Sequence, residues 1–401
     1  MRTFVPYTIS IIALFSVVAC ASDAATGTND LTNLPEFTLS PSPTFTLRDD
    51  GTPNRQFTRI SARHLSNGDI ALADQGSTRL LIFGRDGQMK KELAHKGSGP
   101  GEIAGNFMLT SMGDTLLAFE QSPISIGAVN VFDAVTGFVA RISPHAQNYS
   151  GRMSALAPLS DRAWTVQRGS LGRAIYSIPA VGEFMPDSQT LGVLQLAATA
   201  DSSTVTWLPP IVRSWMVVVP IEGATGVNGS PTTLPVPFAF KGSILNTTSN
   251  DRLWLVNTIS GELVAYDAEG KRVVETTLHI PAKRIEASEL TSARNAATAN
   301  AKNSVAKAAA NGRFYAKALP KTLPLFSEIF AGDSGELWLK TFELLPNKAQ
   351  RFVVVARDGH PIATVVIPAE LRLQHIGRDF VLALSADSQG VESVVEYALK
   401  R

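Results

Sequence analysis

The sequence predicts an all-β fold, a six-bladed β-propeller made of four-stranded antiparallel blades. Two observations predict it. A sequence pattern recurs along the chain, consisting of a polar turn, a strand, a gap, a second strand and a tight acidic-glycine turn. The turns at Gly68, Asp114 and Asp161 follow one another at intervals of about 46 residues, the length of a four-stranded blade. One blade alone cannot bury its faces, so blades stack around an axis and leave only short, protected edges.

The copies of the repeat define the blades in chain order. The clearest copy begins at Ser66 and reaches the turn Arg85-Asp86-Gly87. Further copies begin near residues 113, 160, 250, 334 and 377, and the third of the six lacks the Asp-Gly turn. The last copy ends at Arg401 without a fourth strand, while residues 44–48 form a strand without a blade. We therefore expect this N-terminal strand to join the last blade and close the ring.

Two longer gaps between copies indicate insertions. We expect an irregular insertion at 195–240, where the strand-like residues 215–219 leave a seven-bladed propeller open as the alternative. The second insertion, 281–325, is predicted to be helical, since Ser288-Glu289 begins an alanine-rich run that Asn311-Gly312 ends or breaks.

The helical insertion is also strongly basic. Over residues 281–321, eight basic minus two acidic side chains give a local charge of +6. Such a surface suits anionic lipid headgroups or an acidic ligand, and the alternative is a solvated helical flap packed on one rim. The basic residues are Lys283, Arg284, Arg294, Lys302, Lys307, Arg313, Lys317 and Lys321, and the acidic ones are Glu286 and Glu289.

The chain's single cysteine, Cys20, stands at the end of a leader. Arg2 supplies a positive start, residues 9–18 are mostly apolar, and the small Ala19 precedes the cysteine. This pattern resembles a bacterial lipoprotein signal, which implies a signal peptide over 1–19 and lipidation of Cys20; an ordinary signal peptide is the alternative. The apolar run is too short to cross a bilayer. Residues 20–35 have the composition of a flexible tether, so we expect one propeller domain over 36–401.

A family resemblance follows from several of these segments. The segments that carry the resemblance are the first repeat with the following Lys-Gly-Ser-Gly-Pro-Gly-Glu at 96–102, the Leu-Trp-Leu strands, the turn at 357–359 and the closing segment from Pro368. In these segments the chain resembles the six-bladed, NHL-like propeller lipoproteins of environmental bacteria. The resemblance covers most of the chain after the leader. It implies the fold and export to the bacterial cell envelope, at the outer membrane or the periplasmic face. Members of this group mostly have no assigned activity.

Local motifs for catalysis or metal binding are missing from the sequence. The six histidines include no pair at metal-ligand spacing, and no Gly-x-Ser-x-Gly elbow precedes a helix. The glycine-rich segment 97–102 is predicted to be a turn between blades, because Glu102 stands where a phosphate loop needs Lys and Ser or Thr. Turn carboxylates such as Asp74, Asp133 and Asp267 are expected to cap backbone groups. No metal site and no cofactor are expected.

We predict a binding or scaffold module for a protein, peptide or glycan, anchored to the membrane and without chemistry of its own. A net charge of +1 argues against nucleic acid as a partner. The alternative is a metal-dependent lactonase-like or sugar-processing enzyme with its site in the channel and calcium as the candidate metal; a third reading is a structural partner in an envelope complex. Repeat position predicts a channel cluster that, if it converges, favours an anionic ligand. Its members are Arg59, Arg63, His64, Arg152, Arg372 and His375.

Overall fold

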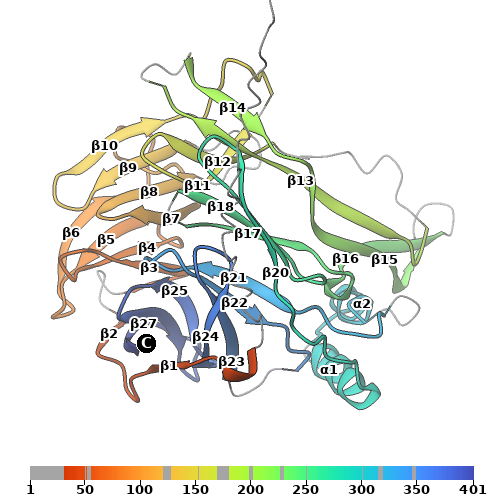
Figure 1. Cartoon of the computed structure of the whole chain (residues 1–401). Helices are drawn as coiled ribbons and strands as arrows, with labels where there is room; N and C mark the ends of the chain where they lie inside the picture. The colour runs from red at the N-terminus through yellow and green to blue at the C-terminus, as the bar shows by residue number, and fades with distance from the viewer. Residues whose placement is uncertain are drawn as a thin grey trace, which may run out of the picture.

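The computed structural model describes residues 31–49, 51, 56–120, 128–151, 153–168, 180–197, 202–225, 230–249, 251–299, 301–314, 319–345 and 349–401. The expected leader, Cys20 and most of the expected tether lie outside these residues. The described chain is nearly all β and forms a propeller, with curled antiparallel sheets arranged about a common centre (Figure 1).

Four sheets contain one repeat each. The first holds β3 (Ile60–His64), β4 (Ile70–Asp74), β5 (Arg79–Phe83) and β6 (Met89–Ala94). The second holds β7 (Phe107–Met112), β8 (Thr115–Glu120), β9 (Val129–Asp133) and β10 (Gly137–Ile142). The third holds β11 (Met153–Pro158), β12 (Ala163–Arg168), β13 (Phe184–Gln195), β14 (Thr204–Trp207), β15 (Ile211–Thr225) and β16 (Pro231–Pro237). The fourth holds β17 (Ile244–Ser249), β18 (Arg252–Asn257), β19 (Glu262–Tyr266) and β20 (Arg272–Thr277).

A nine-stranded sheet contains the last two repeats. Its first group is β21 (Phe326–Ala331), β22 (Leu337–Thr341), β23 (Ala349–Val355) and β24 (Pro361–Pro368). Its second group is β25 (Arg372–Ile376), β26 (Phe380–Ala386), β27 (Glu392–Lys400) and β2 (Phe45–Arg48), and β1 (Glu36–Leu39) joins the two groups. The number of blades stays a prediction.

The N-terminal strand joins the C-terminal repeat, as expected. β2 pairs antiparallel with β27, placing Phe45 opposite Glu396 and Arg48 opposite Ser393. β1 runs parallel to β24 and antiparallel to β27. In Figure 1 the red start of the chain therefore lies beside its blue end.

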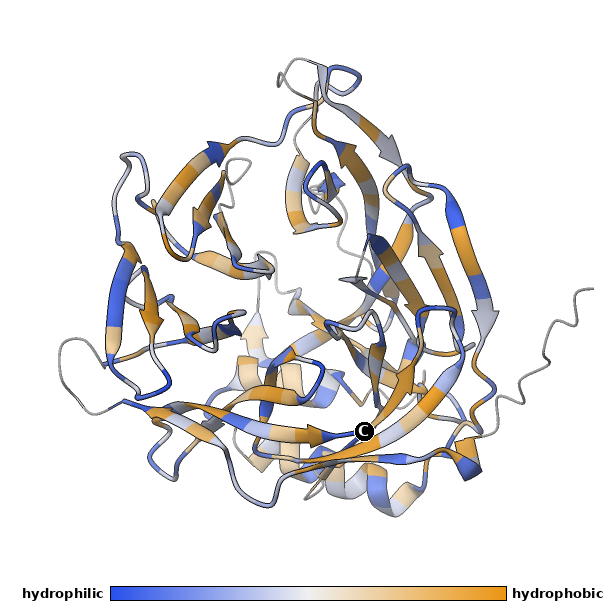
Figure 2. Cartoon of the chain, turned by 60° about the vertical axis from the view of Figure 1, so that its left-hand side comes forward, coloured by the Kyte–Doolittle hydropathy of each residue, from blue (hydrophilic) through white to orange (hydrophobic). Residues whose placement is uncertain are grey.

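Hydrophobic side chains fill the spaces between successive sheets. Trp164 of β12 packs against Phe119 and Val129 of the preceding sheet, and Trp254 of β18 packs in a cluster that includes Leu337 of β22. A further cluster joins β2, β26 and β27 to the first sheet. Figure 2, coloured by hydropathy, shows hydrophobic residues along the strands and hydrophilic residues at many of the turns. Burial between the sheets thus stabilises the fold.

The acidic-glycine turns have the local structure that their sequence requires. Gly87, Gly270 and Gly359 have φ angles of 74°, 78° and 93°, in the left-handed region that favours glycine. The carboxylates also cap backbone groups as predicted: Asp133 Oδ1 accepts the Thr136 N–H at 2.7 Å, and Asp267 Oδ1 accepts the Lys271 N–H at 2.8 Å. These turns fix the hairpins that connect neighbouring strands.

The expectation of an irregular insertion at 195–240 is wrong. This segment contains β14, β15, β16 and the short 3₁₀ helix η4 (Ala239–Lys241). The second half of β13 pairs with β12, while its first half pairs with β15, so β15 and β16 continue the third sheet outward instead of forming a separate one. The strand-like residues 215–219 are indeed a strand, within β15.

The insertion at 281–325 contains the two helices of the described chain, α1 (Ala287–Ala299) and α2 (Ser304–Gly312). Asn303 caps α2 by accepting the Ala306 N–H at 2.8 Å. Ala293 of α1 and Ala308 of α2 are buried in one cluster with Val217 of β15 and Val236 of β16. Within the described part of the chain, neither helix is long and apolar enough to cross a membrane.

Candidate functional site

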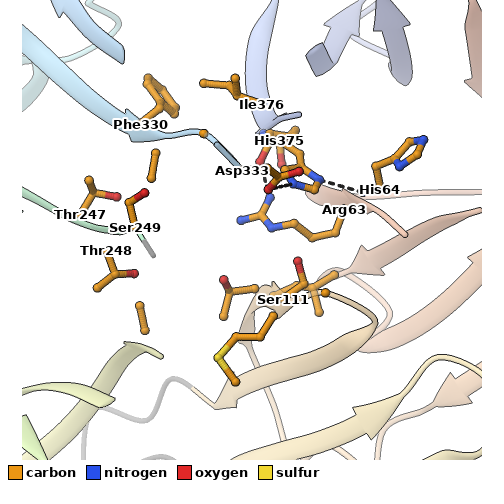
Figure 3. A pocket seen from close by; sticks show the side chains of 18 of the residues that line it. Arg63, His64, Ser111, Thr247, Thr248, Ser249, Phe330, Asp333, His375 and Ile376 are labelled. Atoms are coloured by element: carbon orange, nitrogen blue, oxygen red, sulfur yellow. Dashed lines mark hydrogen bonds and ion pairs between the residues drawn. The ribbon is translucent and has the colours of Figure 1, made fainter. Parts of the chain in front are cut away.

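The centre of the propeller contains a cavity of about 1310 Å³. It is lined by residues of β3, β7, β11, β17, β21 and β25, which are the first strands of the six repeats. First strands of successive repeats lie nearest the axis of a propeller, so residues far apart in sequence meet on one surface. Figure 3 shows this surface from close by. The cavity is our candidate functional site.

One wall of the cavity contains a hydrogen-bonded pair, His375 and Asp333. His375 Nε2 lies 2.8 Å from Asp333 Oδ1, and the backbone N–H of His64 donates to His375 Nδ1 at 3.1 Å. Because Nδ1 accepts a hydrogen bond, we assign the proton of a neutral imidazole to Nε2, which donates it to the carboxylate. Both ring nitrogens are therefore engaged, and the ring is held in one orientation.

Arg63 extends beside this pair (Figure 3). Its Nη1 donates to the carbonyl of Ala62 at 2.9 Å and to the carbonyl of Gln374, which ties β3 to β25. Burial lowers the pKa of Arg63 to about 10, and the negative charge of Asp333 acts in the opposite direction. Arg63 thus remains a cation near neutral pH, and it places several N–H donors at the cavity wall.

A second cluster lies around Glu396, behind His64. Arg85 Nη1 and Nη2 bind the two carboxylate oxygens of Glu396 at 2.6 and 2.8 Å, and Thr44 Oγ1 donates to Oε1 at 3.1 Å. His64 Nε2 lies 3.3 Å from Glu396 Oε2, and its ring stacks on Phe380 at a centroid distance of 4.2 Å. The cluster joins the first sheet to β27 and the segment before β2, so it sits where the ring closes.

Burial is the main reason why the pKa of His64 lies below its ordinary value; the charges of Arg85 and His375 lower it further, while those of Glu396 and Asp333 raise it. The unfolded chain then binds more protons than the folded one between the lowered pKa and about 6.5. The free energy of unfolding is therefore expected to rise with pH through this window, by at most about 1.4 kcal/mol per pH unit for one proton. The stability that comes from neutral His64 is fully present above about pH 6.5 and is lost as the pH falls toward the lowered pKa.

Urea unfolding between pH 5.5 and 7.5 checks this expectation. His64→Gln removes the titrating group and should flatten the slope of stability against pH. The control His279→Gln removes an exposed histidine and should leave the slope unchanged. Equal slopes in the wild type and His64→Gln would rule the effect out.

Other parts of the cavity lining are rich in hydroxyl groups. Thr110 and Ser111 come from β7, and Thr247, Thr248 and Ser249 come from β17. Figure 3 shows the β17 hydroxyls across the cavity from His375 and Arg63, whereas Ser111 of β7 lies next to Arg63. Each hydroxyl both donates and accepts a hydrogen bond. The cavity therefore combines fixed charges with neutral polar groups, of which those of β17 lie across from Arg63 and His375.

The structure brings together only part of the predicted channel cluster. Arg63, His64 and His375 line the cavity. Arg59 is exposed before β3 and is absent from the cavity lining, whereas Arg372 forms an ion pair with Glu392 and is also absent from it. Arg152 lies outside the described residues. The full convergence on which an anionic ligand depended is thus not observed.

The charge balance of the cavity gives a second reason against an anionic ligand. Its lining contains the two arginines Arg63 and Arg85 and the three carboxylates Asp333, Asp379 and Glu396. Counting the arginines and the carboxylates, two minus three gives a formal charge of −1. Sequence reasoning missed these carboxylates. The signal for Asp333 was its turn, Asp333-Ser334-Gly335, which occupies the same repeat position as Ser66-Asn67-Gly68 beside His64.

The glycine-rich segment 97–102 is a closed turn, as predicted. Glu102 Oε2 accepts the Gly99 N–H at 2.6 Å, and backbone hydrogen bonds from Gly99 and Ser98 are a main cause of the lowered pKa of the Glu102 carboxyl. A Cβ on Gly97 would lie 2.0 Å from the same carboxylate. Among the described residues, no group of three or more His, Cys, Asp or Glu side chains is placed to hold a metal ion.

Comparison with known proteins finds similarity at the level of solved structures only. No family model and no curated protein matches the chain. A member of the DUF4221 family from Bacteroides vulgatus is 12% identical over 92% of this chain and 99% of its own, with a TM-score of 0.46. The PQQ-bound aldose sugar dehydrogenase of Streptomyces coelicolor is 11% identical over 92% and 100%, with a TM-score of 0.39. Virginiamycin B lyase of Staphylococcus aureus is 12% identical over 91% and 100%, with a TM-score of 0.39. At such distances these likenesses carry no argument about activity.

Proposed function

We propose that the protein is an exported, lipid-anchored β-propeller that acts as a binding module, and that its central cavity holds an uncharged, hydroxyl-bearing ligand, a glycan. The observation that carries the proposal is the combination of fixed charges and hydroxyl groups in one cavity. Arg63, Asp333 and His375 lie across the cavity from the hydroxyls of β17, and Ser111 of β7 lies beside Arg63. Polar groups placed in this way can serve the many donors and acceptors of a sugar.

The size and charge of the cavity support the same ligand class. Its volume of about 1310 Å³ exceeds the roughly 300–1,000 Å³ that is typical of pockets for drug-sized molecules. A short oligosaccharide therefore has room. The formal charge of −1 offers no net attraction for an anion, and the partly exposed Phe330 supplies apolar surface for the face of a sugar ring. The enzymatic alternative with calcium stays a prediction from sequence.

Calorimetric titration tests the proposal. The full chain carrying Cys20→Ser, which cannot be acylated, is titrated with maltotriose, cellotriose and chitotriose as neutral probes, and with tri-galacturonate and tri-alanine as acidic and peptide probes. We expect at least one neutral trisaccharide to bind and the acidic trisaccharide to bind more weakly. Binding of tri-galacturonate or tri-alanine alone would contradict a neutral glycan, as would binding of none of the probes.

Paired variants place the binding in the cavity. Ser111→Ala combined with Thr248→Val removes two cavity hydroxyls while nearly preserving shape, and should weaken binding at least about thirtyfold, because each of the two polar groups left without a partner costs about 1–3 kcal/mol. Thr206→Val removes an exposed hydroxyl from β14 and should leave binding unchanged. If the Ser111→Ala, Thr248→Val variant binds a neutral ligand as tightly as the Thr206→Val control, the ligand does not contact these cavity hydroxyls.

A further inference from the structure

The helical insertion carries a cluster of unpaired positive charges. We call the segment 281–325 the basic insertion. Five of its basic side chains are exposed, and none of them forms an ion pair with another described residue. These five are Arg284, Lys302, Lys307, Arg313 and Lys321. Lys283, by contrast, is paired with Glu289 at 2.9 Å. An exposed cation without a partner is hydrated and available to an anionic surface.

The basic insertion is fixed to the propeller. α2 packs on β15 and β16 through small side chains, with Ala308 and Ala310 buried while Lys307 remains exposed, and α1 packs on α2. Arg294 Nη2 donates to the carbonyl of Phe314 at 2.9 Å, which ties α1 to the end of α2. At the foot of the insertion, Arg284 and Thr322 form a β-bridge. The positive charges therefore hold a set position relative to the cavity.

The charge of the rest of the chain has the opposite sign. The whole sequence has a formal charge of +1, and residues 281–321 contribute +6, so the remaining residues sum to 1 − 6 = −5. An anionic surface attracts the basic insertion and repels the average of the remaining surface. The charge distribution thus favours one orientation of the protein at such a surface.

The N-terminal end of the described chain lies close to where the basic insertion leaves and rejoins the propeller. Leu31 packs against the cluster that contains Leu278 and Leu325, which stand just before the insertion and at its end. Figure 1 shows the red start of the chain at the same end of the molecule as α1. Cys20 precedes Leu31 by 11 positions, which span at most about 40 Å when fully extended. An anchor at Cys20 therefore keeps the basic insertion close to the membrane.

We propose that the basic insertion docks on anionic lipid headgroups and orients the propeller at the membrane. This inference rests on the proposed lipid anchor for its setting, but the contact itself is electrostatic and independent of acylation. Headgroup phosphates neutralise the five exposed cations, and the Ala-rich helices lie at the surface without inserting an apolar face. Since the contact is between exposed charges, salt screens it.

Vesicle sedimentation tests the docking. The full chain with Cys20→Ser is mixed with vesicles of phosphatidylcholine alone or with 30 mol% phosphatidylglycerol added. We expect binding only to the anionic vesicles, and loss of that binding at 0.5 M salt. Each lysine near an anionic surface is worth about a fivefold change in partition. Lys302→Gln with Lys307→Gln should therefore weaken binding more than tenfold.

A matched pair of substitutions controls for net charge. Lys96→Gln with Arg162→Gln removes the same two charges from exposed positions outside the basic insertion and should change binding less than threefold. Equal losses in the two variants, equal binding to both kinds of vesicle, or no binding overturns the proposal. Mass spectrometry of the wild-type chain reports separately whether Cys20 is acylated, so failure of the anchor and failure of the docking surface are distinguished.

Discussion

A chain that begins at Asp49, and so lacks β1 and β2, is expected to lose its cooperative thermal transition and to aggregate. Without β2, β27 becomes an edge strand that can pair with other chains. The truncation also removes Phe45 and Leu47 from the cluster that joins the last repeat to the first sheet. Leu47 is only 1% exposed, and truncating such a side chain to alanine costs about 2–5 kcal/mol by itself. Loss of the whole strand exceeds this.

Circular dichroism and light scattering during heating measure the effect of the truncation. A chain that begins at Leu31 retains both strands and η1 (Leu31–Asn33), and it should unfold with an unchanged midpoint. Leu47→Ala in the full chain gives the intermediate case, a lower midpoint with a cooperative transition. If the chain from Asp49 melts like the chain from Leu31, β2 does not hold the ring closed.

Replacing Arg85 with glutamine is expected to lower the free energy of unfolding by about 3 kcal/mol at pH 8. The substitution leaves the carboxylate of Glu396, only 6% exposed, without its bidentate partner. Breaking a buried ion pair costs about 3–5 kcal/mol, and the low end applies because Arg85 itself is 41% exposed. The charge of Arg85 also lowers the pKa of His64. In the variant, His64 should bind a proton more readily beside Glu396, so the loss is smaller at pH 6.

Urea unfolding at pH 6 and pH 8 checks both parts of this expectation. Arg272→Gln is the matched control, because Arg272 pairs with Glu275 where both side chains are about half exposed. Surface pairs of this kind contribute about 0–1 kcal/mol. Equal losses for Arg85→Gln and Arg272→Gln would show that the Glu396 cluster does not stabilise the ring closure.

The corrected region at 195–240 shows where sequence patterns mislead. Prolines at 231, 235 and 237 argue against a strand, because proline cannot donate a hydrogen bond to its neighbour. In the structure these prolines belong to β16, which lies at the edge of its sheet. An edge strand tolerates proline, since one row of its N–H groups has no neighbouring strand. Whether a segment lies at an edge is decided by the assembled sheet.

The sequence predicted only part of the candidate site, again because the remaining contacts depend on how the sheets assemble. Arg63, His64 and His375 lie on or at the ends of first strands, so repeat position was enough to place them near the axis. The prediction for Arg59 was wrong because this residue precedes β3 with a φ of 57° and is exposed to solvent. Arg85 and Glu396 are 311 positions apart. No local pattern could have indicated that they meet.

Local sequence patterns were enough to predict the β-propeller and the N-terminal strand that completes the last repeat, because alternation of apolar residues and the chemistry of acidic-glycine turns act over a few residues. The arrangement of the folded chain was needed to show which side chains share the cavity, which charges are paired and where the basic insertion lies relative to the start of the described chain. Those outcomes depend on how distant strands come together around the axis. Each contact there joins residues that only the closed ring brings within a few ångströms.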